Sequence, residues 1–155
     1  MNGQPRNGRT KNAYPKRTAG HRMAIDVPIV QEHQTLSEVR AAIERHAGRF
    51  ATINYIYVVN DAKKLVGVLS IRDVFKHPAH AVAGDVCKRK SLVTIRPEAH
   101  QERAAYLALK NNIKAIPVVD ARHRFLGEIP SDAILTILHN EMHEDALRMA
   151  GIAHE

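Results

Sequence analysis

The chain has 155 residues, of which 45% are apolar, so it can bury a core as one domain or as two small ones. Its single cysteine, Cys87, excludes an internal disulfide and indicates a reducing compartment. No apolar run approaches the roughly 18 residues that span a bilayer, and no apolar segment follows the basic N-terminus as in a secretory signal. We therefore expect neither a membrane-spanning segment nor a secreted protein.

The net charge of +7 is concentrated at the N-terminus. Six basic residues precede Met23 without one acidic residue, whereas the remaining 17 basic residues nearly balance all 16 acidic ones. Residues 1–17 therefore have the composition of a disordered basic tail. Such a tail can be an arm for nucleic acid or an anionic membrane, but basic tails are weak evidence of a partner. We expect a solvated tail, no nucleic-acid partner, and no loss of fold when residues up to Arg17 are removed.

After the tail, the first predicted strand is the β-branched run of residues 27–30. A helix follows, because Thr35 and Glu38 form the sequence pattern of a capping box and apolar residues recur after it at helical spacing. Two short apolar runs, residues 56–59 and 65–69, predict strands joined by a polar turn. A closing helix is expected from about Ile71.

The second half of the chain has the same succession of elements. Residues 92–95 predict a strand, and Pro97 is a suitable first residue for a helix. Residues 116–119 and 125–129 predict two more strands, and a last helix is expected from about Pro130.

This likeness is an internal repeat with a shift of 60 residues. Residues 52–60 align with residues 112–120, and Gly67 aligns with Gly127. The strands are almost continuously apolar, which is typical of sheets covered by helices. The sequence therefore predicts an α/β fold of two β-α-β-β-α units related by an approximate twofold axis.

At these residues the chain resembles the CBS motif, and its two copies resemble a Bateman module. The proposed units are residues 18–80 for the first motif and residues 81–152 for the second, which ends in a long acidic helix. Residues 18–23, 52–59 and 141–151 look like three segments of MgtE-type magnesium transporters, in the family's order.

The resemblance implies a regulatory module without the N-terminal helical domain or the membrane domain of that family. We expect a homodimeric module that is cytoplasmic, possibly at the inner face of the membrane beside a transporter domain, and that does not transport an ion itself. The alternative is a free-standing pair of CBS motifs that reports adenylate state to an unrelated soluble partner. No phosphate loop, nucleophile elbow or carboxylate dyad is present, so no enzyme is expected.

The resemblance further implies a cleft for adenine nucleotides (ATP, ADP or AMP) between the copies. The first copy matches the family's Gly-x-x-Ser/Thr-x-x-Asp pattern, with Ser70 at the helix N-terminus and Asp73 as the ribose acceptor. Arg72 is the candidate phosphate contact, because guanidinium binds phosphate in two-pronged fashion. Tyr57 is expected to stack on adenine. The alternative for Ser70 and Asp73 is a structural role as helix cap and first-turn carboxylate.

The second copy lacks this pair, because Pro130 and Ala133 stand at the two positions. Asp132 lies one residue early, which rotates it by about 100° around a helix. Ile116 and Pro117 remain candidates for an apolar wall over the adenine. We therefore expect one nucleotide site per chain.

Glu141, Glu144 and Asp145 are expected on one face of the last helix. Their like charges favour a cation, and the resemblance implies Mg²⁺, whose ligands would be shared with other chains. The alternative is an ordinary solvated face. His139 and His143 are one turn apart, a spacing that also occurs in transition-metal sites.

Overall fold

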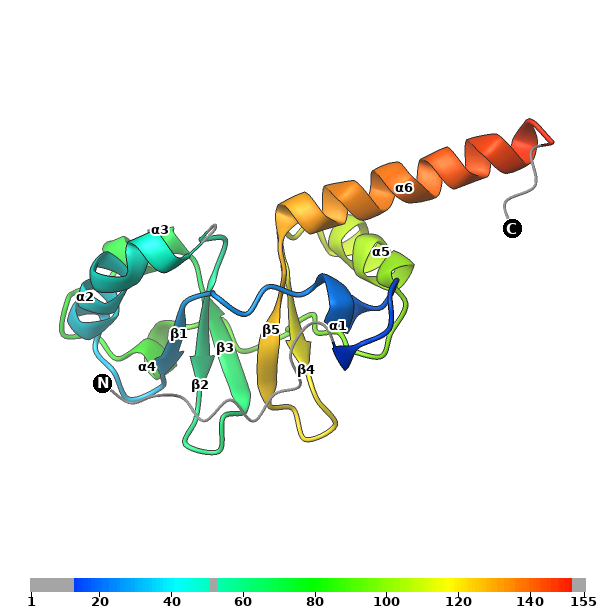
Figure 1. Cartoon of the computed structure of the whole chain (residues 1–155). Helices are drawn as coiled ribbons and strands as arrows, with labels where there is room; N and C mark the ends of the chain where they lie inside the picture. The colour runs from blue at the N-terminus through cyan, green and yellow to red at the C-terminus, as the bar shows by residue number, and fades with distance from the viewer. Residues whose placement is uncertain (1–12, 51–52, 152–155) are drawn as a thin grey trace.

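The structure, a computed structural model, describes residues 13–50 and 53–151. Two small β-sheets stand side by side, with helices α2 and α3 beside one sheet and α5 and α6 beside the other (Figure 1). The elements in chain order are α1 (Ala19–Arg22), β1 (Ile29–Gln31), α2 (Leu36–His46), a 3₁₀ turn (Ala47–Arg49), β2 (Ile56–Val59), β3 (Leu65–Leu69), α3 (Ile71–Lys76), α4 (Ala83–Val86), α5 (Gln101–Asn111), β4 (Ile116–Val119), β5 (Phe125–Ile129) and α6 (Ser131–Met149). The predicted α/β fold is confirmed. Thr52 and Ile152 lie outside the described residues, as does most of the predicted tail.

The first copy is a three-stranded sheet in the order β1-β2-β3, with β1 parallel and β3 antiparallel to β2. Strand β1 begins at Ile29 rather than at residue 27, because Pro28 has no N–H for a ladder bond and contributes only its carbonyl. The capping box of α2 forms as predicted: Glu38 N–H donates to Thr35 Oγ1 and the Glu38 carboxylate accepts from Thr35 N–H. This fixes the start of α2.

The second copy repeats β2, β3 and the start of α3 with the 60-residue shift, as β4, β5 and the start of α6. Its leading strand is the exception. Residues 92–95 were expected to form a strand, but only Ile95 pairs, through one parallel bridge to Val118. In the first copy Tyr57 N–H donates to the Pro28 carbonyl at 3.0 Å. The equivalent residue is Pro117, which has no N–H, so the second ladder stops at one bridge.

Helix α5 begins at Gln101, four residues later than the expected start at Pro97. His100 caps it, since its Nδ1 accepts from Glu102 N–H at 3.1 Å. The carbonyl of Pro97 instead accepts from Gly20 N–H at 2.8 Å, and the carbonyl of Ala99 accepts from the N–H of α1's first residue. The N-terminal segment, residues 13–24, therefore occupies the backbone carbonyls that a longer helix would use.

That segment is the main departure from the prediction of a solvated tail up to Arg17. Tyr14 is 9% exposed and belongs to the core of the second copy together with Met23. Its ring lies so close to Gly20 that a Cβ there would overlap it. Ala24 then pairs with β5 through both backbone hydrogen bonds to Glu128. The N-terminal segment is therefore part of the second copy, with Tyr14 buried and residues 15–17 exposed.

Helix α6 is packed only over its first half. Ile134 and Ile137 are buried against the second copy, whereas Met142 and Met149 are 70% and 89% exposed. The second half extends away from the body (Figure 1). Among the described helices, none combines the length and the apolar character that crossing a membrane requires.

Candidate functional site

Ser70 and Asp73 form a reciprocal cap at the start of α3. Asp73 N–H donates to Ser70 Oγ and Ser70 N–H donates to Asp73 Oδ2, each at 3.0 Å. The structural role weighed for these residues is therefore present. It leaves Asp73 Oδ1 without a hydrogen bond among the described residues, so the carboxylate can still accept from a ligand hydroxyl. Arg72 is exposed and makes no hydrogen bond or ion pair in the described part of the chain, so its guanidinium is available.

Tyr57 does not offer a ring face to a ligand in this structure. It is 0% exposed, its ring stacks on Phe125 at 4.5 Å, and its hydroxyl donates to Glu128 Oε1 at 2.6 Å. Burial raises the pKa of Tyr57, so it stays a donor, and burial also raises the pKa of the Glu128 carboxyl. Tyr57 therefore belongs to the contact between the two copies, and the geometry does not support adenine stacking by it.

Tyr55 is the aromatic residue that the sequence reasoning passed over. It is half-buried, and its hydroxyl accepts from Lys114 N–H at 3.3 Å, across the boundary between the copies. Ser131 Oγ bonds the Lys114 carbonyl and lies 3.2 Å from Asn54 Oδ1. Asn54 and Lys114 are equivalent positions of the repeat. The starts of β2, β4 and α6 therefore meet here. In the sequence, the spacing of two residues between Tyr55 and Tyr57 was a signal that either tyrosine could be the aromatic contact.

The remaining nucleotide candidates lie on the elements that meet at this point. Leu69, the residue before Ser70, pairs with Ile56, which follows Tyr55. Ile116 and Pro117 begin β4, two residues after Lys114, and both are buried. The capped start of α3, Tyr55 and the start of β4 therefore gather at one end of the paired sheets.

The second copy has no equivalent of the Ser70–Asp73 cap. Pro130 stands at the N-cap of α6 without a side-chain bond, and exposed Asp132 accepts only from the N–H of Ala133. The number of nucleotide sites per chain stays a prediction.

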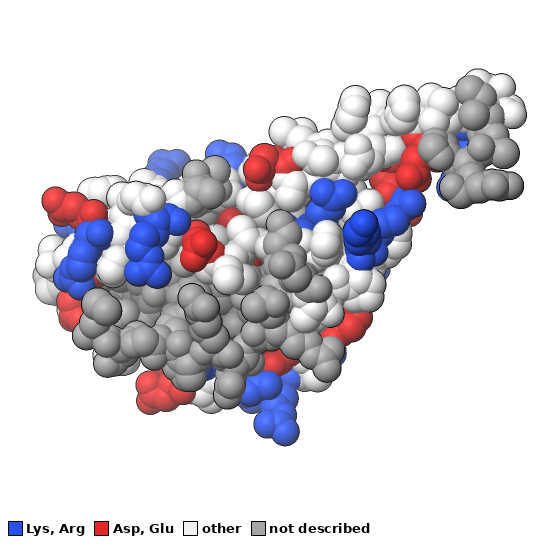
Figure 2. All heavy atoms as spheres, in the orientation of Figure 1, with Lys and Arg blue, Asp and Glu red and all other residues white. Residues whose placement is uncertain are grey.

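Two of the three carboxylates proposed for Mg²⁺ are bound to Arg17. Arg17 Nη2 lies 2.9 Å from Glu144 Oε2 and 3.2 Å from Glu141 Oε1, and these carboxylates raise the pKa of the guanidinium. Asp145 instead lies 3.9 Å from Arg148 on its own helix. Basic and acidic side chains adjoin where α6 leaves the body (Figure 2). The described residues contain no group of three His, Cys, Asp or Glu side chains that could hold a metal ion. Within residues 13–50 and 53–151, these carboxylates therefore do not meet in one cluster.

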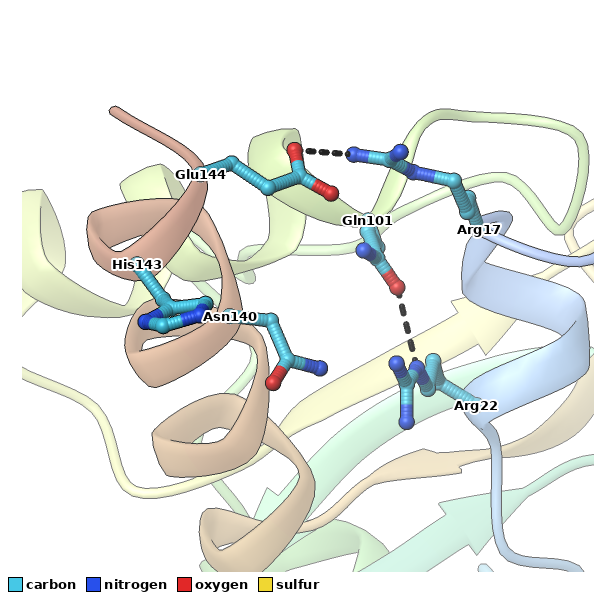
Figure 3. A pocket seen from close by; sticks show the side chains of 6 residues that line it. All are labelled: Arg17, Arg22, Gln101, Asn140, His143 and Glu144. Carbon is cyan, nitrogen blue, oxygen red and sulfur yellow. Dashed lines mark hydrogen bonds and ion pairs between the residues drawn. The ribbon is translucent and has the colours of Figure 1, made fainter. Parts of the chain in front are cut away.

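A pocket of about 240 Å³ lies beside these ion pairs, between the N-terminal segment and α6 (Figure 3). Its floor is Gln101, which is 2% exposed, accepts from Arg22 Nε at 2.9 Å and donates to Glu141 at 3.2 Å. A hydrogen bond with Glu141 raises the pKa of Glu102 and lowers that of Glu141. The lining residues are Arg17, Arg22, Gln101, Asn140, His143 and Glu144.

Comparison with known proteins places this geometry in a family. The CBS domain family matches residues 19–80 and 83–140. The chain is 32% identical over 139 residues to the magnesium transporter MgtE of Thermus thermophilus, over 90% of this chain and 31% of the transporter. It is 29% identical over 137 residues to MgtE of Bacillus subtilis, over 88% and 30%. The chain thus spans about a third of the length of these transporters.

A solved structure shows the same arrangement. The crystal structure of the cytosolic domain of the Mg²⁺ channel MgtE in complex with ATP has a TM-score of 0.79 and 31% sequence identity, over 83% of this chain and 51% of that chain. Each family match contains one of the two sheets, β1-β2-β3 in residues 19–80 and β4-β5 in residues 83–140. The chain therefore belongs to the CBS domain family, as a tandem pair of CBS motifs homologous to the cytosolic CBS region of MgtE.

Proposed function

We propose that this chain is a regulatory CBS module of an MgtE-like magnesium transport system, which senses adenine nucleotide and Mg²⁺ and does not itself transport the ion. The observation that carries the proposal is the likeness to the MgtE cytosolic domain in complex with ATP. That likeness, with alignment to MgtE over 90% of the chain, makes the cytosol the proposed location and a membrane transporter domain the proposed partner.

The nucleotide site is proposed at the meeting point of the two copies. Asp73 would accept the ribose hydroxyls through Oδ1, and Arg72 would contact the phosphates. Tyr55 replaces Tyr57 as the proposed aromatic contact, because it is half-buried at the boundary whereas Tyr57 is covered. Ile116 and Pro117 keep their proposed place as the apolar wall from the second copy.

Magnesium sensing is proposed at α6 with ligands from more than one chain. Glu141 and Glu144 lie close enough to share Arg17, so they can share another cation, whereas Asp145 stands apart from them. Two carboxylates suit Mg²⁺, which keeps several waters, if a homodimer partner or a membrane domain completes the site.

Titration calorimetry with AMP, ADP and ATP, with and without Mg²⁺, tests the nucleotide half of the proposal. We expect one site per chain, and Asp73→Ala should weaken binding by about 1–3 kcal/mol, because buried ligand hydroxyls lose their acceptor. The matched control is Asp132→Ala, which removes an exposed first-turn carboxylate from the second copy. Because Asp73 also caps α3, helix content is measured in parallel.

A stoichiometry near two per chain, or equal binding by both variants, would contradict the proposed site. A nucleotide affinity that is the same with and without Mg²⁺ would favour the alternative, a free-standing pair of CBS motifs that reports adenylate state.

A further inference from the structure

The contacts of Arg17 suggest a role beyond nucleotide and ion sensing. Its backbone carbonyl accepts from Gln101 N–H at 2.8 Å, at the start of α5. Its guanidinium reaches Glu141 and Glu144, which are 124 and 127 residues away in the sequence. One residue thus joins the N-terminal segment, α5 and α6.

The backbone of Arg17 is held in an unfavourable conformation. Its φ of 70° lies in the left-handed region, which non-glycine residues adopt rarely. The surrounding contacts must compensate for this strain. Its neighbours on both sides are fixed, since Tyr14 is buried in the second copy and Thr18 caps α1 through a bond from His21 N–H. The side chain is therefore directed at α6 by a docked segment.

These bonds hold the part of α6 that extends from the body. Among the described residues, Glu141 and Glu144 make the hydrogen bonds that connect the helix beyond Leu138 to other elements, with Arg17 and Gln101 as partners. The side chains of Glu141 and Glu144 are only 17% and 27% exposed, although Met142 between them is 70% exposed. The second half of α6 is thus tied to Arg17 and to Gln101 of α5 through these two carboxylates.

The adjoining pocket is better explained as part of this contact than as a ligand site. The guanidinium of Arg17 is paired with Glu141 and Glu144, and Arg22 Nε donates to Gln101, so the polar side chains of both arginines at the pocket already have partners within the chain. Buried Gln101 is satisfied on both sides by Arg22 and Glu141, which leaves no orphaned group on the pocket floor.

We propose that Arg17, Gln101, Glu141 and Glu144 form a clasp that couples the N-terminal segment to the direction of α6. When the clasp is closed, the second half of α6 is fixed relative to the second copy. When it opens, the packed first half stays in place and the second half is released. A displacement of residues 13–18 is thereby transmitted to α6.

Hydrogen–deuterium exchange of the full chain, without nucleotide or Mg²⁺, tests the clasp directly. In Arg17→Gln, amides of residues 139–149 should exchange about two- to fivefold faster, which is the range for exposed ion pairs. Amides of β2 and β4 should be unchanged. Arg17→Gly should also accelerate exchange, although it relieves the backbone strain, because the guanidinium is what holds α6.

Two comparisons make the test specific. Arg148→Gln is the matched control, because Arg148 is an exposed arginine of the same helix with a partner only on that helix. In a Glu141→Gln, Glu144→Gln background, Arg17→Gln should add no further acceleration, since the pairs are already lost. Equal exchange in Arg17→Gln and wild type, or the same acceleration with and without the glutamates, would overturn the proposal. Neither result bears on nucleotide or Mg²⁺ binding.

Discussion

Replacing Tyr57 by Phe tests the contact that joins the two CBS copies. The change keeps the ring on Phe125 and removes only the hydroxyl that donates to Glu128 at 2.6 Å. Glu128 is 1% exposed, and its other carboxylate oxygen, Oε2, has no hydrogen-bond partner among the described residues. The variant therefore leaves a buried carboxyl group without the donor that the tyrosine supplied.

The expected loss of stability follows from that geometry. A buried acceptor that loses its partner destabilises a protein by about 1–3 kcal/mol. Because both residues lie between the copies, about 2 kcal/mol is expected, or roughly 4–8 °C in Tm for a chain of this size. Tyr106→Phe is the matched control. Tyr106 is 56% exposed and its ring lies beneath the ammonium group of Lys110, so the Tm of Tyr106→Phe should differ from that of wild type by less than about 1 °C.

Thermal unfolding followed by circular dichroism at neutral pH measures both variants. Equal Tm values for Tyr57→Phe and Tyr106→Phe would refute the reasoning, because they would show that the buried hydroxyl contributes nothing to the contact between the copies.

Three further predictions follow from the same structure. The pKa of the Glu128 carboxyl is raised, so the folded state keeps this proton to higher pH than the unfolded chain does, and the free energy of unfolding of wild type should fall as the pH rises above the ordinary carboxyl pKa. Glu128→Gln should lack this pH-dependent fall. An equal dependence of stability on pH in the two proteins would contradict the prediction. Tyr14→Ala should cost about 3 kcal/mol, as for a buried aromatic, and a Tm equal to wild type would show that the segment is not docked. Magnesium at ten times its Kd should stabilise the protein by about 1.4 kcal/mol more than sodium at the same ionic strength. This additional stability should vanish when Glu141 and Glu144 are replaced by Gln. Identical melting curves in the two salts would contradict the proposed Mg²⁺ sensing.

Much of the fold could be predicted because its signals are local. The paired valines, the glycines and the polar turns placed all four hairpin strands at the residues where they occur. The capping box at Thr35 and Glu38 formed because both partners lie within one helical turn. The same locality explains the cap at Ser70 and Asp73, for which the sequence left a structural and a binding role open.

The candidate site was less predictable because alternation along a strand does not show which residue another copy will cover. Tyr55 and Tyr57 are two residues apart, and only the packing of the second copy buries one and leaves the other half-buried at the boundary. The start of α5 was misplaced for a similar reason. Pro97 is suited to a helix start, but the N-terminal segment takes up its carbonyl.

The sequence alone therefore determined the repeat, the hairpins, the helix caps at Thr35 and Ser70, and the family resemblance, because these depend on patterns of residues near one another in the chain. Tertiary structure decided the rest. It placed Tyr14 in the core of the second copy and directed Arg17 to Glu141 and Glu144, more than 120 residues away. A basic residue in a polar, glycine-rich stretch has the same local pattern whether it is solvated or paired, because its partner is chosen by the folded chain and not by its sequence neighbours.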